Sequence, residues 1–237
     1  MLNFKRFLAA ALTALASVSW VSGQSNSSGR EMSVEESYLQ ESIELMIIRE
    51  QSRSDSRDLQ FVALEYIRQA IERGNTSDEI RNALEYLALA GTVNKSRENG
   101  RMLNNFPDVR VRAAEYLGDF KTKEATGALI KMILADNEPM VITEAIYSLA
   151  KIGINDNEET INAIGKVLAR YNSLNPDNRL ALAVLNAYDN LAQQNGGLKN
   201  PEAVRTIMLI YNGKYIRAVQ NRANEVLNNI RKYSAKK

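Results

Sequence analysis

The sequence predicts an all-α fold, an α-solenoid of about five antiparallel helix pairs. The stretch from Pro107 to Gly118 returns 32 residues later as Pro139 to Ala150, and helix-pair units of about this period stack into open arrays. Apolar residues recur at spacings of three and four, whereas the period of two typical of strands is absent. Each of the four prolines stands where an apolar helical pattern begins, the position at which a helix tolerates proline.

The first 23 residues have the layout of a secretory signal peptide. Lys5 and Arg6 precede an uncharged apolar run from Phe7 to Val21, and small residues follow. The run is shorter than the roughly 20 residues that span a bilayer, so a permanent anchor is the less favoured alternative. We expect cleavage after Gly23 and an exported, periplasmic protein that does not span the membrane. The chain has no cysteine, so a lipid anchor of the bacterial lipoprotein type is excluded.

Residues 24–32 are small and polar and predict a flexible tether. Residues 33–106 form an N-terminal helical region with divergent repeats. A capping box at Ser33 to Glu36 opens a helix over 33–53, a second helix over 56–73 stops at Gly74, and a capping box at Thr76 to Glu79 opens a third that ends at Gly91. The segment 92–106 is irregular, and we favour a partly helical connector over a long loop.

Residues 107–237 contain the regular repeats and end in a basic capping helix. Asn175 and Asn200 directly precede prolines, and Asn137 stands two residues before one, so these asparagines are predicted N-caps. Helices are predicted at 107–119, 121–135, 138–152, 158–171, 176–194, 201–212 and 215–233.

The segment Asp108 to Gly118, followed by Lys123-Glu124-Ala125 and Leu129 to Leu134, resembles the HEAT-like repeat family, in the short form found in phycobilisome lyases. Copies recur at 144–153 and 222–227, so the resemblance covers 107–233 well and 56–91 weakly. It implies the fold. No residues of a pigment site can be matched, so lyase activity is not expected.

The repeats also depart from the family pattern. Ile142 and Glu144 stand where the preceding repeat has Arg110 and Arg112, which interrupts the arginine ladder that some members use between repeats. Arg179 is predicted to occupy the position of Arg110 in the repeat after Pro176.

Neither histidine nor cysteine occurs in the chain. This removes the commonest zinc ligands, Ser-His-Asp triads and Cys-His pairs. We therefore expect no metal, no cofactor and no catalytic residues, and we interpret the protein as not an enzyme. A carboxylate- or lysine-dependent enzyme stays open as the least favoured alternative.

Charge is distributed unevenly along the chain. Residues 24–100 contain 9 basic and 14 acidic residues, whereas residues 196–237 contain 9 and 2. In a solenoid, sequence order becomes spatial order, so one end should be basic. Arg217, Arg222, Arg231 and Lys232 are the candidate partner-binding residues there, against the alternative of a solvated capping helix. The formal charge from residue 24 onward is zero, so we do not expect nucleic-acid binding.

The second helix of each pair usually lines the ligand-facing side of such arrays. Asn162, Lys166 and Arg170 lie four apart on one stripe of helix 158–171, and Lys131 and Arg205 would continue it on neighbouring pairs. An ordinary solvated helix face is the alternative. The tyrosines at 66, 86 and 116 share one motif position, and we expect them to pack between repeats with their hydroxyls at the edge.

These observations favour a protein-binding scaffold or assembly factor of the cell envelope. The second hypothesis is a structural component of an envelope-attached machine, docked or self-associated through its basic end.

Overall fold

The computed structural model describes residues 33–174 and 176–235, so the predicted signal peptide and tether lie outside the described part of the chain. The chain divides into two compact units, Met1–Tyr38 and Leu39–Lys237. In the first unit the predicted capping box is confirmed. The Ser33 N–H donates to Glu36 Oε2 at 2.9 Å, and the Glu36 N–H donates to Ser33 Oγ at 3.2 Å.

The described residues form ten α-helices, as predicted, with bounds that differ from the predicted ones by a few residues. They are α1 Val34–Ser52, α2 Arg57–Glu72, α3 Asp78–Leu89, α4 Pro107–Leu117, α5 Lys123–Ala135, α6 Pro139–Ile152, α7 Glu159–Leu174, α8 Asn178–Asn195, α9 Pro201–Tyr211 and α10 Arg217–Ala235. A single 3₁₀ turn, Asp156–Glu158, precedes α7.

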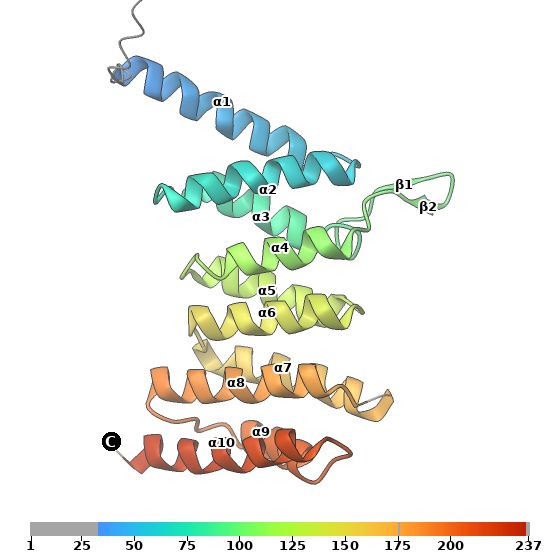
Figure 1. The fold of residues 1–237 in the computed structure, drawn as a ribbon, viewed down its shortest axis with the longest axis vertical. Helices are drawn as coiled ribbons and strands as arrows, with labels where there is room; N and C mark the ends of the chain where they lie inside the picture. The colour runs from blue at the N-terminus through green and yellow to red at the C-terminus, as the bar shows by residue number, and fades with distance from the viewer. Residues whose placement is uncertain (1–32, 175, 236–237) are drawn as a thin grey trace, which may run out of the picture. The chain divides into compact units, whose positions relative to one another are not determined.

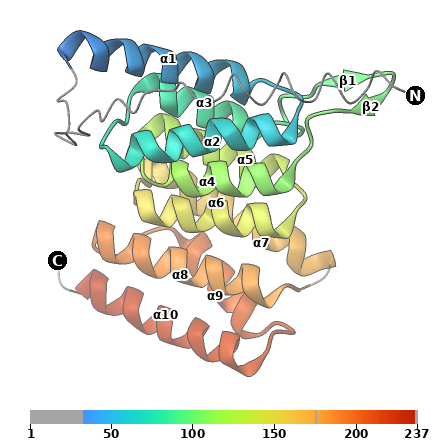
Figure 2. The ribbon, with the colours of Figure 1, turned by 45° about the horizontal axis from the view of Figure 1, so that its top comes forward.

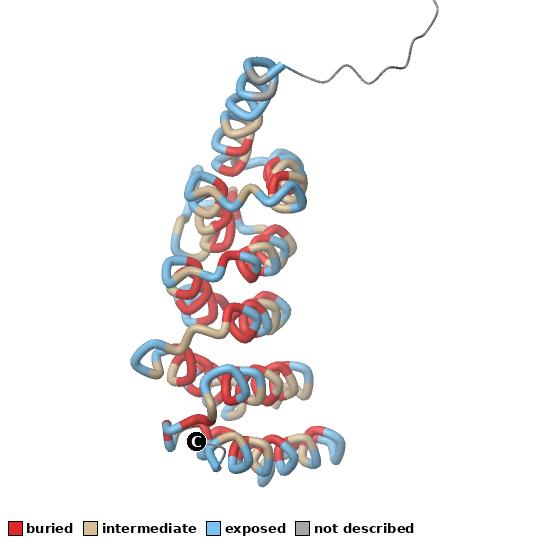
Figure 3. The backbone as a smooth tube through the Cα atoms, turned by 90° about the vertical axis from the view of Figure 1, so that its left-hand side faces the viewer, coloured by how far each residue is buried: buried red, intermediate tan, exposed pale blue. Residues whose placement is uncertain are grey.

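Within Leu39–Lys237 the helices form two layers. The even-numbered helices α2 to α10 pack each against the next and make one layer, in front in Figure 1, and the odd-numbered helices α3 to α9 make the second. The view in Figure 2 shows the same alternation. Buried residues gather between the layers, and the outward sides of the helices are exposed (Figure 3). The prediction of an all-α solenoid is confirmed.

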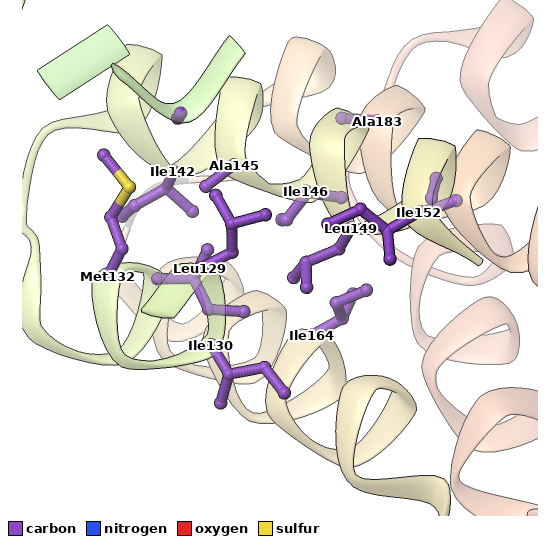
Figure 4. Close-up of a cluster of buried hydrophobic side chains, with 14 of the residues drawn as sticks. Leu129, Ile130, Met132, Ile142, Ala145, Ile146, Leu149, Ile152, Ile164 and Ala183 are labelled. Carbon is purple, nitrogen blue, oxygen red and sulfur yellow. The ribbon is translucent and has the colours of Figure 1, made fainter. Parts of the chain in front are cut away.

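The core between the layers comes from the repeated apolar pattern. On α6, Ile142, Ile146 and Leu149 recur at spacings of three and four and are fully buried. They meet Leu129 of α5 and Ile164 of α7 in the cluster of Figure 4. Burying each such side chain contributes about 1.5–3 kcal/mol, so each repeat depends on its neighbours for stability.

The segment between α3 and α4 is not a partly helical connector, and the prediction that the chain has no strand is wrong there. Strands β1 (Arg97–Glu98) and β2 (Arg101–Met102) pair antiparallel around Asn99-Gly100. Both turn residues have positive φ, 48° and 81°. Asn-Gly favours this two-residue hairpin turn because both residues tolerate the left-handed region. The hairpin projects away from the helices in Figures 1 and 2.

The base of the hairpin is tied down by Asn104, which is 2% exposed. Its Oδ1 accepts the Ser96 N–H at 2.9 Å, and its Nδ2 donates to the Asn94 carbonyl at 2.8 Å. Gly91 has a φ of +74°, and a Cβ there would lie 2.6 Å from Asn105 Cα. The chain therefore enters this segment by a turn that only glycine fits without strain.

Of the predicted helix caps, Asn200 is confirmed, since its side chain accepts the Glu202 N–H at 2.8 Å. Asn137 is not a cap, because α6 begins at Pro139 after Glu138. Asn175 lies outside the described residues. Asp177 caps α8 by accepting two backbone N–H groups, so Pro176 precedes the helix rather than lying in its first turn.

The predicted capping box at Thr76 to Glu79 is also wrong. Helix α3 begins at Asp78, and the Ser77 side chain makes no capping bond. Asn75 Oδ1 accepts the Ser77 N–H at 3.1 Å instead. Gly74, with a φ of +82°, ends the preceding helix as predicted. In the tight turn that follows, the Asn75 side chain therefore accepts the Ser77 N–H.

Candidate functional site

A groove runs over the outer side of the even layer, where α2, α4 and α6 lie side by side. Two adjoining hollows of about 310 and 260 Å³ share Arg68, Arg112 and Tyr116. We call it the even-layer groove, and its lining is Phe61, Leu64, Glu65, Arg68, Ile71, Glu72, Arg112, Glu115, Tyr116, Asp119 and Lys151. The lining is mainly charged, with one tyrosine at its centre.

The 32-residue repeat places groove residues next to their equivalents. Asp119, two residues after α4, and Lys151 at the end of α6 occupy the same repeat position. Their side chains form an ion pair with Nζ to Oδ1 at 2.6 Å. Arg112 and Glu144 are a second equivalent pair of opposite sign. The opposite charges at these two positions favour neighbouring α4 and α6 electrostatically.

The cations of the groove already have acidic neighbours in the free protein. Arg68 pairs with Glu65 at 2.6 Å and with Glu72, and the hydrogen bond from Arg68 lowers the pKa of Glu65 to about 2. Arg112 pairs with Glu115 at 2.8 Å. These pairs are largely exposed, so each contributes little to stability. They hold the polar side chains in place along the groove.

Glu144 lies beside the groove, and its pKa is raised. Burial is the main cause that raises its pKa, and the charge of Glu115 raises it further, against smaller opposing effects of Arg112 and Lys151. With Glu144 the groove has five carboxyl groups (Glu65, Glu72, Glu115, Asp119, Glu144) and three cations (Arg68, Arg112, Lys151). It is therefore suited to a ligand that brings positive charge.

Tyr116 forms the floor where the two hollows meet. It is half-buried, and burial raises the pKa of its hydroxyl. The Arg112 guanidinium lies over its ring, 6.0 Å from the centroid. Tyr66, Tyr86 and Tyr116 are all half-buried, and Tyr66 and Tyr116 pack against the core. This agrees with the expected position between repeats.

A buried ion pair fixes α4 to the layer behind it. Arg110 Nε donates to Asp136 Oδ2 at 2.6 Å, and both side chains are 2% exposed. The same guanidinium donates to Asn105 Oδ1 at 2.7 Å and to the Ala90 carbonyl at 3.3 Å. Asp136 Oδ1 also accepts the N–H groups of Asn137 and Glu138. One guanidinium therefore joins the end of α3, the hairpin segment, α4 and the turn before α6.

The arginine ladder is interrupted as the sequence indicates, because Ile142 is fully buried at the repeat position of Arg110. Arg179 does not take that buried position, since it is exposed. It lies in the first turn of α8, which begins at Asn178, whereas Arg110 lies one turn into α4.

The five stripe residues predicted on the second helices lie on α5, α7 and α9. Lys131, Lys166 and Arg205 are exposed. Arg170 donates to the carbonyls of Ile133, Leu134 and Asp136, where α5 ends, and Asn162 accepts from Asn200 at 2.8 Å. Arg170 and Asn162 therefore connect neighbouring repeats, whereas Lys131, Lys166 and Arg205 stay exposed. Arg205 also pairs with Glu202 of its own helix at 3.6 Å.

Three of the four residues predicted at the basic end are exposed on α10, namely Arg217, Arg231 and Lys232. Arg222 is half-buried and turns toward α8, where it pairs with Asp189 at 2.7 Å and donates to Asn186 at 3.1 Å. It also pairs with Glu225 at 2.9 Å. Arg222 thus packs α10 against α8.

The helix pairs repeat along the chain, and their apolar positions recur from α4 to α6. Residues 101–185 match the family model for HEAT repeats. This match supports a HEAT-like repeat protein and covers β2, α4 to α7 and the first part of α8. No curated protein matches the chain, and no solved structure matches it.

Within residues 33–174 and 176–235, no group of three or more acidic side chains is placed to bind a metal ion. Among the same residues, no helix is both long enough and apolar enough to cross a membrane.

Sequence reasoning did not find the even-layer groove. The residue pairs at 112/144 and 119/151 have opposite charges at equivalent repeat positions, and this was the signal that could have revealed it.

Proposed function

We propose that this chain is an exported, non-enzymatic scaffold or assembly factor of the cell envelope, built from HEAT-like repeats of the short type. The N-terminal signal-like segment supports export. The repeat match supports protein interaction, because solenoids of this kind present extended binding surfaces.

The partner that the even-layer groove fits best is a protein segment with exposed lysine or arginine. The observation that carries this proposal is the composition of the groove, whose lining carries four carboxylates (Glu65, Glu72, Glu115, Asp119) against three cations. Partly buried Glu144 lies beside them, and its pKa is raised by burial and by Glu115. A cation from a partner would offset the rise in pKa, since an opposite charge nearby favours the ionised carboxylate. Tyr116 offers an aromatic surface beside it for an aliphatic stem or a cation.

The test compares two charge-reversal variants of the full chain. The double variant Glu115→Lys/Glu144→Lys changes the groove, and Glu124→Lys/Glu159→Lys makes the same charge change at exposed positions of the odd layer. Both are used to capture partners from the envelope fraction of the producing cells. We expect the control to recover the same partner as the parent and the groove variant to lose it.

Equal recovery by both variants would remove the groove as the binding site. Export is tested separately by mass spectrometry of the protein from the producing cells. A mature N-terminus at Gln24 is the expected result, and an intact N-terminus in the cytoplasm contradicts the proposal.

A further inference from the structure

The last odd-numbered helix exposes an apolar stripe. On α9, Val204, Met208 and Tyr211 are 42%, 39% and 44% exposed and follow one another at spacings of four and three, so they lie on one side of the helix. The residues that α9 buries in the core are Ala203, Thr206, Ile207 and Ile210.

This stripe faces away from the rest of the odd layer. On the side of α9 toward α7, Thr206 Oγ1 and Glu202 Cγ lie 3.0 and 3.4 Å from the place of a Cβ on Gly165. At 100° per residue, Met208 lies about 160° around the helix from Thr206. The stripe therefore lies on the side of α9 where the next odd-numbered helix of an array would pack. The described residues contain no such helix after α9.

The first odd-numbered helix exposes a matching stripe. On α1, Leu39, Ile43 and Met46 are 61%, 52% and 58% exposed, again at spacings of four and three. The opposite side of α1 carries the buried Ile48 and faces α3 across a hollow of about 170 Å³. Helix α1 is thus apolar on two sides, although one would suffice to attach it to the array.

The charges around the two stripes differ in sign. Residues 39–100 contain 8 basic and 11 acidic residues, whereas residues 196–235 contain 7 and 2. Exposed Glu50 extends the α1 stripe by one turn, and exposed Arg217, Arg231 and Lys232 lie on α10 beside α9. Unlike ends attract and like ends repel, so the charges select a contact between the two different ends.

We propose that copies of this chain associate head to tail, with Val204, Met208 and Tyr211 of one copy against Leu39, Ile43 and Met46 of the next. The contact places α9 of one molecule against α1 of the next. Because the two surfaces differ, each copy keeps one free end, and the assembly grows as an open row rather than closing as a dimer. The proposal is independent of the even-layer groove.

The test uses sedimentation velocity on the protein as purified from the producing cells and on two variants. Met208→Glu places a charge in the α9 stripe, and Ile43→Glu does so in the α1 stripe. We expect the parent to form a concentration-dependent series of multimers, and each variant alone to associate at least roughly tenfold more weakly because the contact would desolvate the new charge. An equimolar mixture of the two variants retains one intact pair of ends and should give a dimer and nothing larger.

Met140→Glu is the matched control, since Met140 is 60% exposed on α6 away from both ends, and it should associate like the parent. The absence of cysteine permits a second measurement, in which oxidation should cross-link Met208→Cys to Ile43→Cys in a mixture but neither variant to itself. The proposal would be overturned if the parent stayed monomeric at every concentration or if the mixture of the two variants stayed monomeric. Self-association of Ile43→Glu, whose only intact stripe is that of α9, would also overturn it.

Discussion

Replacing Arg110 by methionine should destabilise the array more than any exposed substitution. Both members of the Arg110–Asp136 pair are 2% exposed, and removing one partner of such a pair costs about 3–5 kcal/mol because the other charge stays buried. The Asp136 carboxylate keeps its bonds from the Asn137 and Glu138 N–H groups. We therefore expect Arg110→Met at the lower end, about 3 kcal/mol.

Replacing the other member of the pair, Asp136, should lower the free energy of unfolding further. Asp136→Ala leaves the guanidinium with only Asn105 and Ala90 as acceptors and removes two bonds to the backbone before α6, so we expect about 5 kcal/mol. In the double variant no charge is stranded. Its cost should fall below the sum of the single variants by about 2–3 kcal/mol.

The assay is urea unfolding followed by circular dichroism, with the four proteins of the double-mutant cycle measured side by side. Because stacked repeats can unfold piecewise, hydrogen exchange should also show the loss of protection concentrated at the end of α3, in α4 and at the turn before α6. Arg112→Met, two residues away and exposed, is the control and should change stability by less than about 0.5 kcal/mol. Additive single variants, or a loss below about 1 kcal/mol for Arg110→Met, would refute the reasoning.

Three further predictions concern a turn, a cap and a titrating group. Gly91→Ala should lower the free energy of unfolding by about 2 kcal/mol or more, because the residue has positive φ and its new Cβ would meet Asn105. Thermal unfolding measures this loss, and an unchanged midpoint temperature would contradict it. Asn200→Ala should cost about 1–2 kcal/mol, since it removes the cap of α9 and the bond to Asn162; Lys199→Ala, exposed next to it, is the control in the same urea assay. Glu144 should take up its proton at a higher pH than Glu65 in a carboxyl NMR titration, because the pKa of Glu144 is raised and that of Glu65 is lowered to about 2. A raised carboxyl pKa destabilises the folded state at pH values above that pKa, and it has no effect at pH values below the pKa of the unfolded chain. Glu144→Gln should therefore stabilise the protein slightly at neutral pH and have no such effect in acid. If Glu65 took up its proton at a higher pH than Glu144, both statements would be wrong.

The repeat explains why the helices were predictable. A helix pair that returns after 32 residues with apolar positions at spacings of three and four buries its apolar surface against its neighbours. Local signals were reliable where one side chain acts on the adjacent backbone, as at Ser33 and Asn200. They failed at Asn137 because α6 begins two residues later, at Pro139. They failed at Thr76 to Glu79 because α3 begins at Asp78 and Asn75 accepts the Ser77 N–H instead.

The hairpin was missed for a different reason. Its strands are two residues each, too short for an alternating pattern, and its signal is confined to Asn99-Gly100. The even-layer groove was missed because its residues come from three helices and are spaced by the repeat rather than by the helix. Only equivalent positions compared across repeats, such as Asp119 and Lys151, point to it.

The amino-acid sequence by itself determined the solenoid, its ten helices and the unequal charge of its two ends, because these follow from periodicity and composition. Only the tertiary structure decided which polar residues are free. In it, Arg170 and Arg222 connect neighbouring repeats, and Arg110 is buried against Asp136. Glu144 lies partly buried beside a groove. It also showed that, among the described residues, α1 and α9 each expose an apolar stripe. Such properties depend on what lies across the gap between helices, and that is set by packing rather than by any segment alone.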